Sequence, residues 1–299
     1  MSVLNRDGLL NISLLDGQAR AVLIESTAMV QAAKDIHGLS KIATAALGRT
    51  LTAAAMMGSM LKGRDESVTA SIRGGGPIGT VLAVANDRCD VKGYVDNPAI
   101  DLPRTGPKLP VGAAVGRDGR LTIIKDMHLR EPYVGQVNLV SGEIAEDFAM
   151  YFTASEQTPS LVSLGVLVSD EKVESAGGLI VQVMPGATEA AIKSIELSAG
   201  MFTDISGTMK EYHLEGAVNQ LLLHLEPEIL ERRDTRYACD CSRERVERAL
   251  ITLGRDELQD MIEKQHGAQV DCHFCNKRYQ FSESELAALL RATTAREDQ

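Results

Sequence analysis

Four of the five cysteines lie in two short islands near the C-terminus of this 299-residue chain. Cys239 and Cys241 form a C-x-C pair, Cys272 and Cys275 form a C-x-x-C pair, and residues 242–271 separate the two pairs. Cysteine thiolates are common ligands of Zn²⁺, which binds four of them tetrahedrally at about 2.3 Å. The spacing therefore predicts a zinc site built from these four sulfurs.

The sequence is also compatible with other roles for these cysteines. Two sulfurs separated only by Asp240 can form a local disulfide, which would be strained, and strained disulfides are labile and regulatory. His266 and His273 are alternative ligands, although His273 lies inside the C-x-x-C loop, where the backbone usually directs the flanking sulfurs to the metal. The four thiols can also be ordinary buried cysteines.

Composition disfavours a nucleic-acid partner. The chain carries 41 acidic and 31 basic residues, and the formal net charge of −10 works against attraction to a phosphate backbone. Aromatic residues make up 4% of the chain and Trp is absent, so base stacking is poorly supplied. Hydrophobic content of 44% with 24% charged residues indicates a folded globular protein.

The sequence predicts neither a membrane span nor a signal peptide, so we expect a cytoplasmic protein. No apolar run reaches about 18 residues, and even the Ala- and Met-rich segment 42–61 contains Arg49. The N-terminus has charges at Arg6 and Asp7 and no apolar run long enough for a signal peptide. In a reducing compartment, clustered cysteines are more often metal ligands or redox devices than structural disulfides.

Through the first two thirds of the chain, β-branched segments occur in runs and do not alternate strictly with helices. This pattern favours an α+β fold, with a large mixed N-terminal core domain that is mainly β-sheet with packed helices. Helices are predicted at 27–36, 41–62 and 142–156, the last one opened by Ser141. Strands are predicted at 20–26, 67–73, 78–85, 90–96, 119–125, 133–140, 161–169 and 178–184.

Helices dominate after Pro185-Gly186, and a stripe of apolar residues that begins at Leu214 predicts one with a buried face. The charged segment 226–236, which contains Pro227, reads as a connector. We therefore expect a core domain over residues 1–186, a helical linker region over 187–236 and a zinc-binding domain over 237–299.

The last sixty or so residues predict a small unit of their own. Ser242 is suited to cap a helix that ends at Gly254, and a second helix follows before Gly267. Short strands near 268–272 and 278–281 flank the second cysteine pair, and Ser282 with Glu285 forms a capping box for a last helix. A chain of this size buries little surface and commonly needs a metal or disulfide. Bound zinc, with an apparent binding free energy of roughly 10–16 kcal/mol, would then be needed for folding.

No catalytic motif is evident, so we expect no enzyme activity and no nucleotide. The glycine run 74–79 lacks the Lys-Ser/Thr of a phosphate loop and reads as a turn between strands. Cys89 is interpreted as a lone buried or half-buried thiol, and the acidic pair Glu146-Asp147 as part of the solvated face of a helix. Met56, Met57 and Met60 are interpreted as helical core, with an adaptable binding surface as the alternative. The histidines are interpreted as structural or surface residues, namely His37, His128, His213 and His224.

The cysteine pattern resembles the C-terminal zinc centre of the redox-regulated heat shock protein 33 family, the 33 kDa chaperonins of bacteria. Cys239-Asp240-Cys241 and Cys272-His273-Phe274-Cys275 carry the likeness. Four stretches of the core are also similar to that family: AALGRTLTAAAMMGSMLKG at 45–63, SIRGGGPIGTVLAVA at 71–85, LVSGEIAEDFAMYFTASEQTPS at 139–160 and SAGGLIVQVMPG at 175–186.

The resemblance implies an ATP-independent holdase, a stress-response chaperone that binds unfolding client proteins. It implies that the reduced protein binds one Zn²⁺ through Cys239, Cys241, Cys272 and Cys275 and is inactive. It further implies that oxidation forms the disulfides Cys239–Cys241 and Cys272–Cys275, releases zinc, unfolds the switch domain and favours a homodimer. Linker helices and a face of the core would bind clients.

Two other classes of protein fit the sequence less well than a holdase. A zinc-ribbon protein that binds nucleic acid is disfavoured by the acidic charge. A thiol-disulfide oxidoreductase using the C-x-x-C pair usually needs a thioredoxin-like βαβ setting, which residues 237–299 do not predict.

Overall fold

The chain folds into two compact units, and Ala238 and Cys239 mark the boundary between them. The structure is a computed structural model that describes residues 7–104, 106 and 108–297. In this described part of the chain, no helix has the length and apolar character needed to cross a membrane.

The first sheet of the first unit is antiparallel and has five strands in the order β10-β1-β2-β9-β8. These strands are β1 (Gly8–Leu14), β2 (Ala19–Glu25), β8 (Ser160–Val168), β9 (Val173–Val183) and β10 (Glu228–Asp234). Strand β1 was not predicted. Leu9 packs into one hydrophobic core and Leu10 into another, so the strand is buried on both faces and does not show an apolar-polar alternation.

The second sheet has six strands in the order β11-β5-β4-β3-β6-β7. They are β3 (Ser67–Arg73), β4 (Thr80–Asn86), β5 (Asp90–Val95), β6 (Arg120–Asp126), β7 (Tyr133–Asn138) and β11 (Arg236–Tyr237). All neighbours are antiparallel except β11, which runs parallel to β5. Every predicted strand is present, and the α+β class is confirmed.

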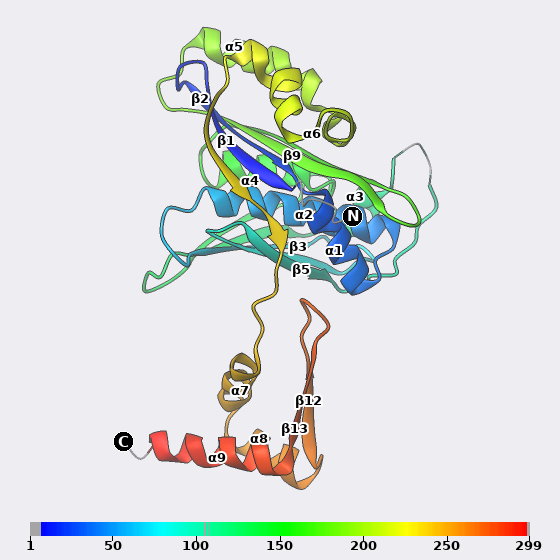
Figure 1. The fold of residues 1–299 in the computed structure, drawn as a ribbon, viewed down its shortest axis with the longest axis vertical. Coiled ribbons are helices and arrows are strands. Elements are labelled where there is room, and N and C mark those ends of the chain that lie inside the picture. The colour runs from blue at the N-terminus through cyan, green and yellow to red at the C-terminus, as the bar shows by residue number, and fades with distance from the viewer. Residues whose placement is uncertain (1–6, 105, 107, 298–299) are drawn as a thin grey trace, which may run out of the picture. The chain divides into compact units, whose positions relative to one another are not determined.

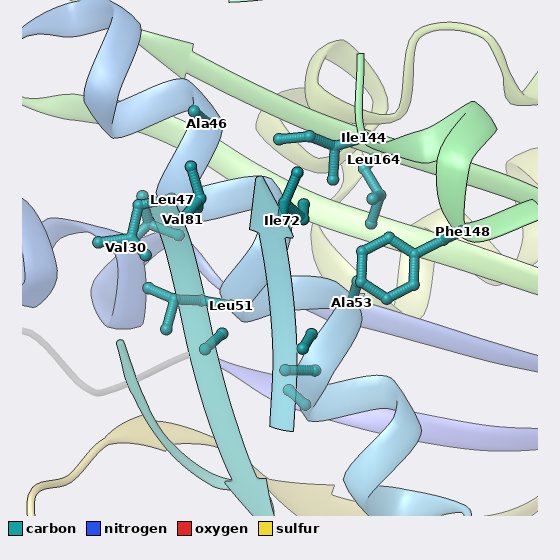
Figure 2. Close-up of a cluster of buried hydrophobic side chains, with 14 of the residues drawn as sticks. Val30, Ala46, Leu47, Leu51, Ala53, Ile72, Val81, Ile144, Phe148 and Leu164 are labelled. Atoms are coloured by element: carbon teal, nitrogen blue, oxygen red, sulfur yellow. The ribbon is translucent and has the colours of Figure 1, made fainter. Parts of the chain in front are cut away.

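Helix α2 (Lys41–Ser59) lies between the two sheets, with α1 (Thr27–His37) beside it (Figure 1). Ala, Thr and Gly make up much of α2, and these small side chains let both sheets approach its backbone. Figure 2 shows Leu47 and Leu51 of α2 facing Ile72 and Val81 of the second sheet, and Phe148 nearby. Met56 and Met57 are 0% and 2% exposed, so their interpretation as core is confirmed, whereas Met60 is only partly buried against the same core.

A second core covers the other face of the first sheet. Leu10, Ile12 and Leu23 pack there against α5 (Glu189–Ser198) and α6 (Ile205–Leu222). The one-turn helix η1 (Ala199–Phe202) joins α5 to α6, and the one-turn helix η2 (Leu223–Leu225) follows α6. The predicted stripe on α6 is confirmed, because Leu214, Ala217, Val218, Leu221 and Leu222 are all buried in this core. Residues 187–236 are therefore packed within the first unit.

The prediction of a connector at 226–236 was wrong. Residues 228–234 form β10, which pairs with β1 at the edge of the first sheet, and Arg236 and Tyr237 form β11 at the edge of the second sheet. Charged side chains are tolerated there because an edge strand faces solvent. Thr235, which joins the two strands, is 1% exposed and donates a hydrogen bond to the carbonyl of Cys89. Residues 228–237 thus supply an edge strand to each of the two sheets.

The second unit has three helices and a two-stranded sheet. They are α7 (Arg243–Thr252), α8 (Arg255–Glu263), β12 (Gly267–Asp271), β13 (Arg278–Ser282) and α9 (Glu283–Glu297), close to the predicted elements. The capping box is present, because Ser282 N–H donates to Glu285 Oε2 and Glu285 N–H donates to Ser282 Oγ. Its hydrophobic core is small, with five buried members, namely Leu250, Leu258, Tyr279, Phe281 and Leu286.

The glycine run is a turn between β3 and β4, as predicted. A Cβ on Gly74 or Gly76 would collide with the backbone at the end of α3 (Val111–Val115), and Gly75 and Gly79 both have a φ of +74°. Close backbone packing and positive φ explain the glycines without a phosphate ligand.

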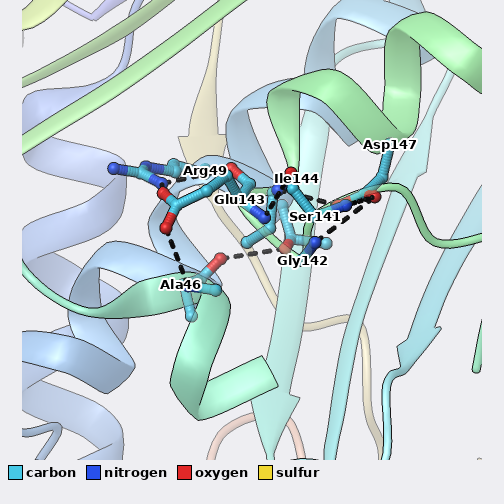
Figure 3. Close-up of polar contacts among 9 residues, drawn as sticks. Ala46, Arg49, Ser141, Gly142, Glu143, Ile144 and Asp147 are labelled. Carbon is cyan, nitrogen blue, oxygen red and sulfur yellow. Dashed lines mark hydrogen bonds and ion pairs between the residues drawn. The ribbon is translucent and has the colours of Figure 1, made fainter. Parts of the chain in front are cut away.

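A buried carboxylate opens helix α4 (Ala145–Ala154), which begins later than the predicted Ser141. Asp147, which is 0% exposed, accepts hydrogen bonds from the N–H groups of Val140, Ser141, Gly142 and Ile144 (Figure 3). The prediction of a solvated face holds for Glu146, which is exposed, but was wrong for Asp147, because its carboxylate turns inward to bind these N–H groups. The same turn is tied to α2, since Arg49 Nη1 lies 2.8 Å from Glu143 Oε2.

Replacement of Asp147 by Ala should lower the free energy of unfolding of the first unit by about 3 kcal/mol or more, because it leaves buried backbone donors without an acceptor. Urea denaturation measures this. Glu146→Ala removes an exposed carboxylate from the same helix and should change stability by only about 0.5 kcal/mol. Equal effects of the two substitutions would contradict the assignment.

A second buried carboxylate, Asp7, caps α1 and is sensitive to pH. Its oxygens accept hydrogen bonds from the N–H groups of Ala28 and Met29 at 2.9 and 2.6 Å. Burial is the largest effect and, with the nearby charge of Glu25, raises the pKa of Asp7 to about 6 despite these hydrogen bonds. The folded state therefore holds this proton more tightly than the unfolded chain does.

The contribution of Asp7 to stability should be greatest below pH 3.8 and should be lost as the pH rises through about 6. The difference in unfolding free energy between wild type and Asp7→Asn should accordingly fall by up to about 3 kcal/mol between pH 4 and pH 7. Denaturant titrations across this range test the expectation, with the exposed Asp16→Asn as matched control. A difference that rises with pH would show that the sign is wrong.

Candidate metal centre

The four predicted cysteines come together in the second unit. The Sγ atoms of Cys239 and Cys272 are 3.7 Å apart, those of Cys241 and Cys275 are 3.3 Å apart, and all four lie within 4.8 Å of one another. All four are free thiols. Both of these short contacts join the two islands, so each sulfur of the C-x-C pair faces a sulfur of the C-x-x-C pair.

The first island is held extended by the helix that follows it. Ser242 is the N-cap of α7, with φ −139° and ψ 164°, and its hydroxyl accepts a hydrogen bond from Arg245 N–H. Arg245 also forms an ion pair with Asp240, the residue between the two cysteines. The sulfurs of Cys239 and Cys241 therefore precede a capped helix start and do not belong to the helix.

The second island is a tight turn between β12 and β13. The N–H of Cys272 donates to Lys277 O at 2.9 Å, and the N–H of Asn276 donates to Cys272 O at 2.8 Å. Asn276 takes a φ of +57°, a left-handed conformation that Asn tolerates better than most residues. This turn fixes the backbone on both sides of Cys272 and Cys275.

The arrangement fits a tetrahedral metal ion. A Zn–S bond of about 2.3 Å places the sulfurs of a Zn(Cys)₄ site about 3.8 Å apart. The distance of 3.7 Å between Cys239 and Cys272 is close to that value, that of 3.3 Å between Cys241 and Cys275 is shorter, and all four sulfurs lie within 4.8 Å of one another. Four thiolates form a ligand set that suits zinc. Zn²⁺ bound here would be held by Cys239, Cys241, Cys272 and Cys275.

The four thiols do not share one electrostatic environment. Burial raises the pKa of Cys239 and that of Cys275. Burial also opposes ionisation of Cys241, but a hydrogen bond from the Tyr279 hydroxyl and bonds with the neighbouring thiols lower its pKa to about 7. Hydrogen bonding therefore acts on the pKa of Cys241 in the opposite direction to the burial that dominates at Cys239 and Cys275.

The centre is continuous with the small core of its unit. Cys241 and Cys272 both pack against the cluster that contains Leu250, Tyr279 and Phe281. Arg243, next to the first island, bonds Glu285 at the start of α9 at 2.6 Å and lies over the Phe281 ring. A change at the sulfurs therefore reaches the packing of this unit directly.

Neither histidine considered as a ligand belongs to the cluster. In the described ranges, the group of side chains with metal-binding geometry consists of the four cysteines alone. His266 is exposed, and its Nδ1 lies 3.0 Å from Glu283 Oε1.

Cys89 lies in the first unit and is 0% exposed, as expected for a lone structural thiol. Burial raises its pKa to about 11, so this thiol is poorly reactive.

The sequence reasoning missed Tyr279 and Arg243. Tyr279 lies four positions after Cys275 and two positions before Phe281 on β13. Residues two apart on a strand share a face, so strand periodicity could have placed both rings on the core side. No sequence pattern predicts the contact between the Tyr279 hydroxyl and Cys241.

Together, the fold and the centre define a class of protein in which a mixed α/β core is followed by a small unit built around four cysteines. The chain matches the family model described as Hsp33 protein over residues 7–282. It belongs to the Hsp33 family, and the resemblance noted from the sequence is confirmed.

Individual relatives agree with this assignment. The chain is 46% identical over 288 residues to the 33 kDa chaperonin of Clostridioides difficile, covering 96% of this chain and 99% of that protein. It is 46% identical over 274 residues to the 33 kDa chaperonin of Alkaliphilus metalliredigens, covering 91% and 94%. The crystal structure of the 33 kDa chaperonin from Thermotoga maritima matches with a TM-score of 0.87 at 36% identity, covering 97% of this chain and 99% of that one.

Substitution of Cys272 by Ser should abolish stable zinc binding, because a hydroxyl is a far weaker zinc ligand than a thiolate. Metal analysis after dialysis under reducing conditions measures the zinc content per chain. Cys89→Ser is the matched control and should retain the wild-type content. Retention of zinc by Cys272→Ser would remove Cys272 from the ligand set.

Proposed function

We propose that this protein is a redox-regulated, ATP-independent holdase chaperone that binds unfolding client proteins when its four-cysteine zinc centre is oxidised. Its relatives are named 33 kDa chaperonins, which supports a chaperone function. The observation that supports redox regulation is the cluster of four free thiols, two of which pack against the core of the second unit. In this proposal the reduced, zinc-bound protein is inactive.

Zinc would hold the second unit together. Five buried side chains form its core, which is little for a unit of this size. A structural zinc ion supplies roughly 10–16 kcal/mol of apparent binding free energy, and that energy stabilises the folded state. The ion would also join the two islands, because each of them supplies two ligands.

Oxidation by hydrogen peroxide would remove this cross-link. A thiolate attacks the O–O bond, giving a sulfenic acid and hydroxide. A second thiolate then attacks the sulfenic sulfur, forming a disulfide and releasing a second hydroxide. We assign the disulfides to Cys239–Cys241 and Cys272–Cys275, which close short loops and leave the two islands unconnected. Zinc would leave as Zn²⁺ because its ligands are consumed.

Melting of the second unit would be transmitted along the chain to β11 and β10. Ala238 N–H donates to Val91 O at 2.8 Å, and the Tyr237 hydroxyl donates to Gly93 O at 2.8 Å. Cys239 follows directly. Unfolding that begins at the cysteines therefore starts next to the last hydrogen bonds that hold this segment to the second sheet.

Residues 187–236 would supply client-binding surface. This region contains large apolar side chains that are already exposed, namely Leu197, Met201, Tyr212, Leu223, Ile229 and Leu230. Loosening of this region would add the apolar face of α6 to them. We accordingly divide the chain into a core domain at 1–186, a linker region at 187–236 and a switch domain at 237–299.

The remaining parts of the proposal concern partners and location. We propose a homodimer after activation, a cytoplasmic location, no catalytic activity and no nucleotide requirement. A nucleic-acid partner is disfavoured by the net charge of −10.

Titration with hydrogen peroxide tests the proposal on one sample. Zinc release is followed with a chromogenic chelator, backbone protection by hydrogen exchange, and holdase activity by light scattering from a heat-unfolding client. We expect zinc loss, loss of protection at residues 239–297 and suppression of client aggregation to rise together. Cys89→Ser should behave as wild type.

Two results would contradict the proposal. One is equal suppression of aggregation by reduced and oxidised protein. The other is a second unit that stays protected after all zinc has left. Peptide mapping identifies the disulfides, and Cys239–Cys272 with Cys241–Cys275, which would tie the islands together, would refute the assigned pairing.

A further inference from the structure

Tyr279 connects the two cysteine islands through its hydroxyl. It lies on β13, just after the second island, and its register partner across the sheet is Val270 of β12. Its hydroxyl donates a hydrogen bond to Cys241 Sγ, in the first island, at 3.1 Å. A side chain that follows one pair of cysteines thus contacts a sulfur of the other pair.

The position of this hydroxyl is fixed by packing. Tyr279 is 5% exposed and belongs to the core cluster with Leu250, Leu258 and Phe281. The Lys277 ammonium lies 5.1 Å from the centre of its ring. A ring confined in this way holds its hydroxyl against the sulfur at little further entropic cost, as partners of metal ligands commonly do.

We propose that Tyr279 is a positioning residue of the redox switch: its hydroxyl holds Cys241 in the ligand geometry and lowers the reactivity of that sulfur toward hydroperoxides, which sets the oxidant level at which zinc is released. The inference rests on the proposed function, because it concerns the sensitivity of the same centre.

The physical reason lies in the electron density on sulfur. Four thiolates around Zn²⁺ carry a net charge of −2, and a hydrogen bond donated to one of them takes up part of that charge. A sulfur whose lone pair accepts a hydrogen bond is a weaker nucleophile for the O–O bond of a peroxide. The same bond favours the ligated form, so its loss should weaken zinc binding as well as speed oxidation.

The contact also gives Cys241 a role different from that of Cys239. The step concerned is attack of the Cys241 thiolate on hydrogen peroxide, which yields a sulfenic acid and hydroxide. Attack by a second thiolate then forms a disulfide and releases another hydroxide. Tyr279 takes no part in the bond changes and acts only through Cys241.

The test is Tyr279→Phe, which keeps the ring in the core and removes only the hydroxyl. Both proteins are loaded with zinc under reducing conditions, and zinc release is followed with a chromogenic chelator in excess hydrogen peroxide. We expect release from the variant to be about 10-fold faster, and its zinc affinity in chelator competition to be about 10-fold lower. Tyr133→Phe removes a hydroxyl that bonds Ser155 in the first unit and should match wild type.

A second measurement separates this role from general loosening of the unit. Zinc transfer to the chelator is timed without oxidant, and hydrogen exchange is recorded for the reduced, zinc-loaded proteins. The inference requires that the ratio of the release rate of the variant to that of wild type is larger with peroxide than without it. Hydrogen-exchange protection of residues 239–297 should be the same in both reduced, zinc-loaded proteins. Equal acceleration with and without peroxide, or a variant that cannot be loaded with zinc, would overturn it.

The outcomes also distinguish this inference from the proposed function. A wild-type protein that binds no zinc, or keeps it in peroxide, refutes the proposed function and this inference together. A wild-type protein that releases zinc in peroxide at the same rate as Tyr279→Phe refutes the inference alone.

Discussion

The second unit depends on one constraint, the gathering of four sulfurs from two separate islands. Among the residues of this unit whose side chains the structure describes, five are buried in a common core, and two of the cysteines pack against that core. The first unit is different, because two hydrophobic clusters cover both faces of its first sheet. One chain therefore joins a unit with two extensive hydrophobic cores to a unit with a small core that packs directly against a cluster of four sulfurs.

The centre could be predicted from the sequence because its information is local. Its signals each occupy a few consecutive residues and are readable in the sequence. They are the two cysteine pairs, the capping serine at 242 and the capping box at 282. Tyr279 was missed because its contact with Cys241 spans 38 residues and depends on how a strand and an extended segment pack. Propensity and spacing carry no such information.

The helices and strands could be predicted where one face of the element is apolar and the other is polar. Strand β1 lacks this difference because both of its faces are buried. Strand β10 was mistaken for a connector because charged residues at a sheet edge look like a linker in sequence. The start of α4 was misplaced by a few residues because Asp147 at the third position of the helix, rather than Ser141, binds the free N–H groups.

The edge position of β10 has a consequence for what the protein can recognise. If β10 leaves the first sheet, β1 becomes the edge, and the backbone donors and acceptors that face Glu228–Asp234 lose their partners. Main-chain groups of this kind pair with any extended polypeptide, whatever its side chains. An open sheet edge between two hydrophobic faces would therefore select for backbone extension and not for sequence, which would suit the proposed holdase function.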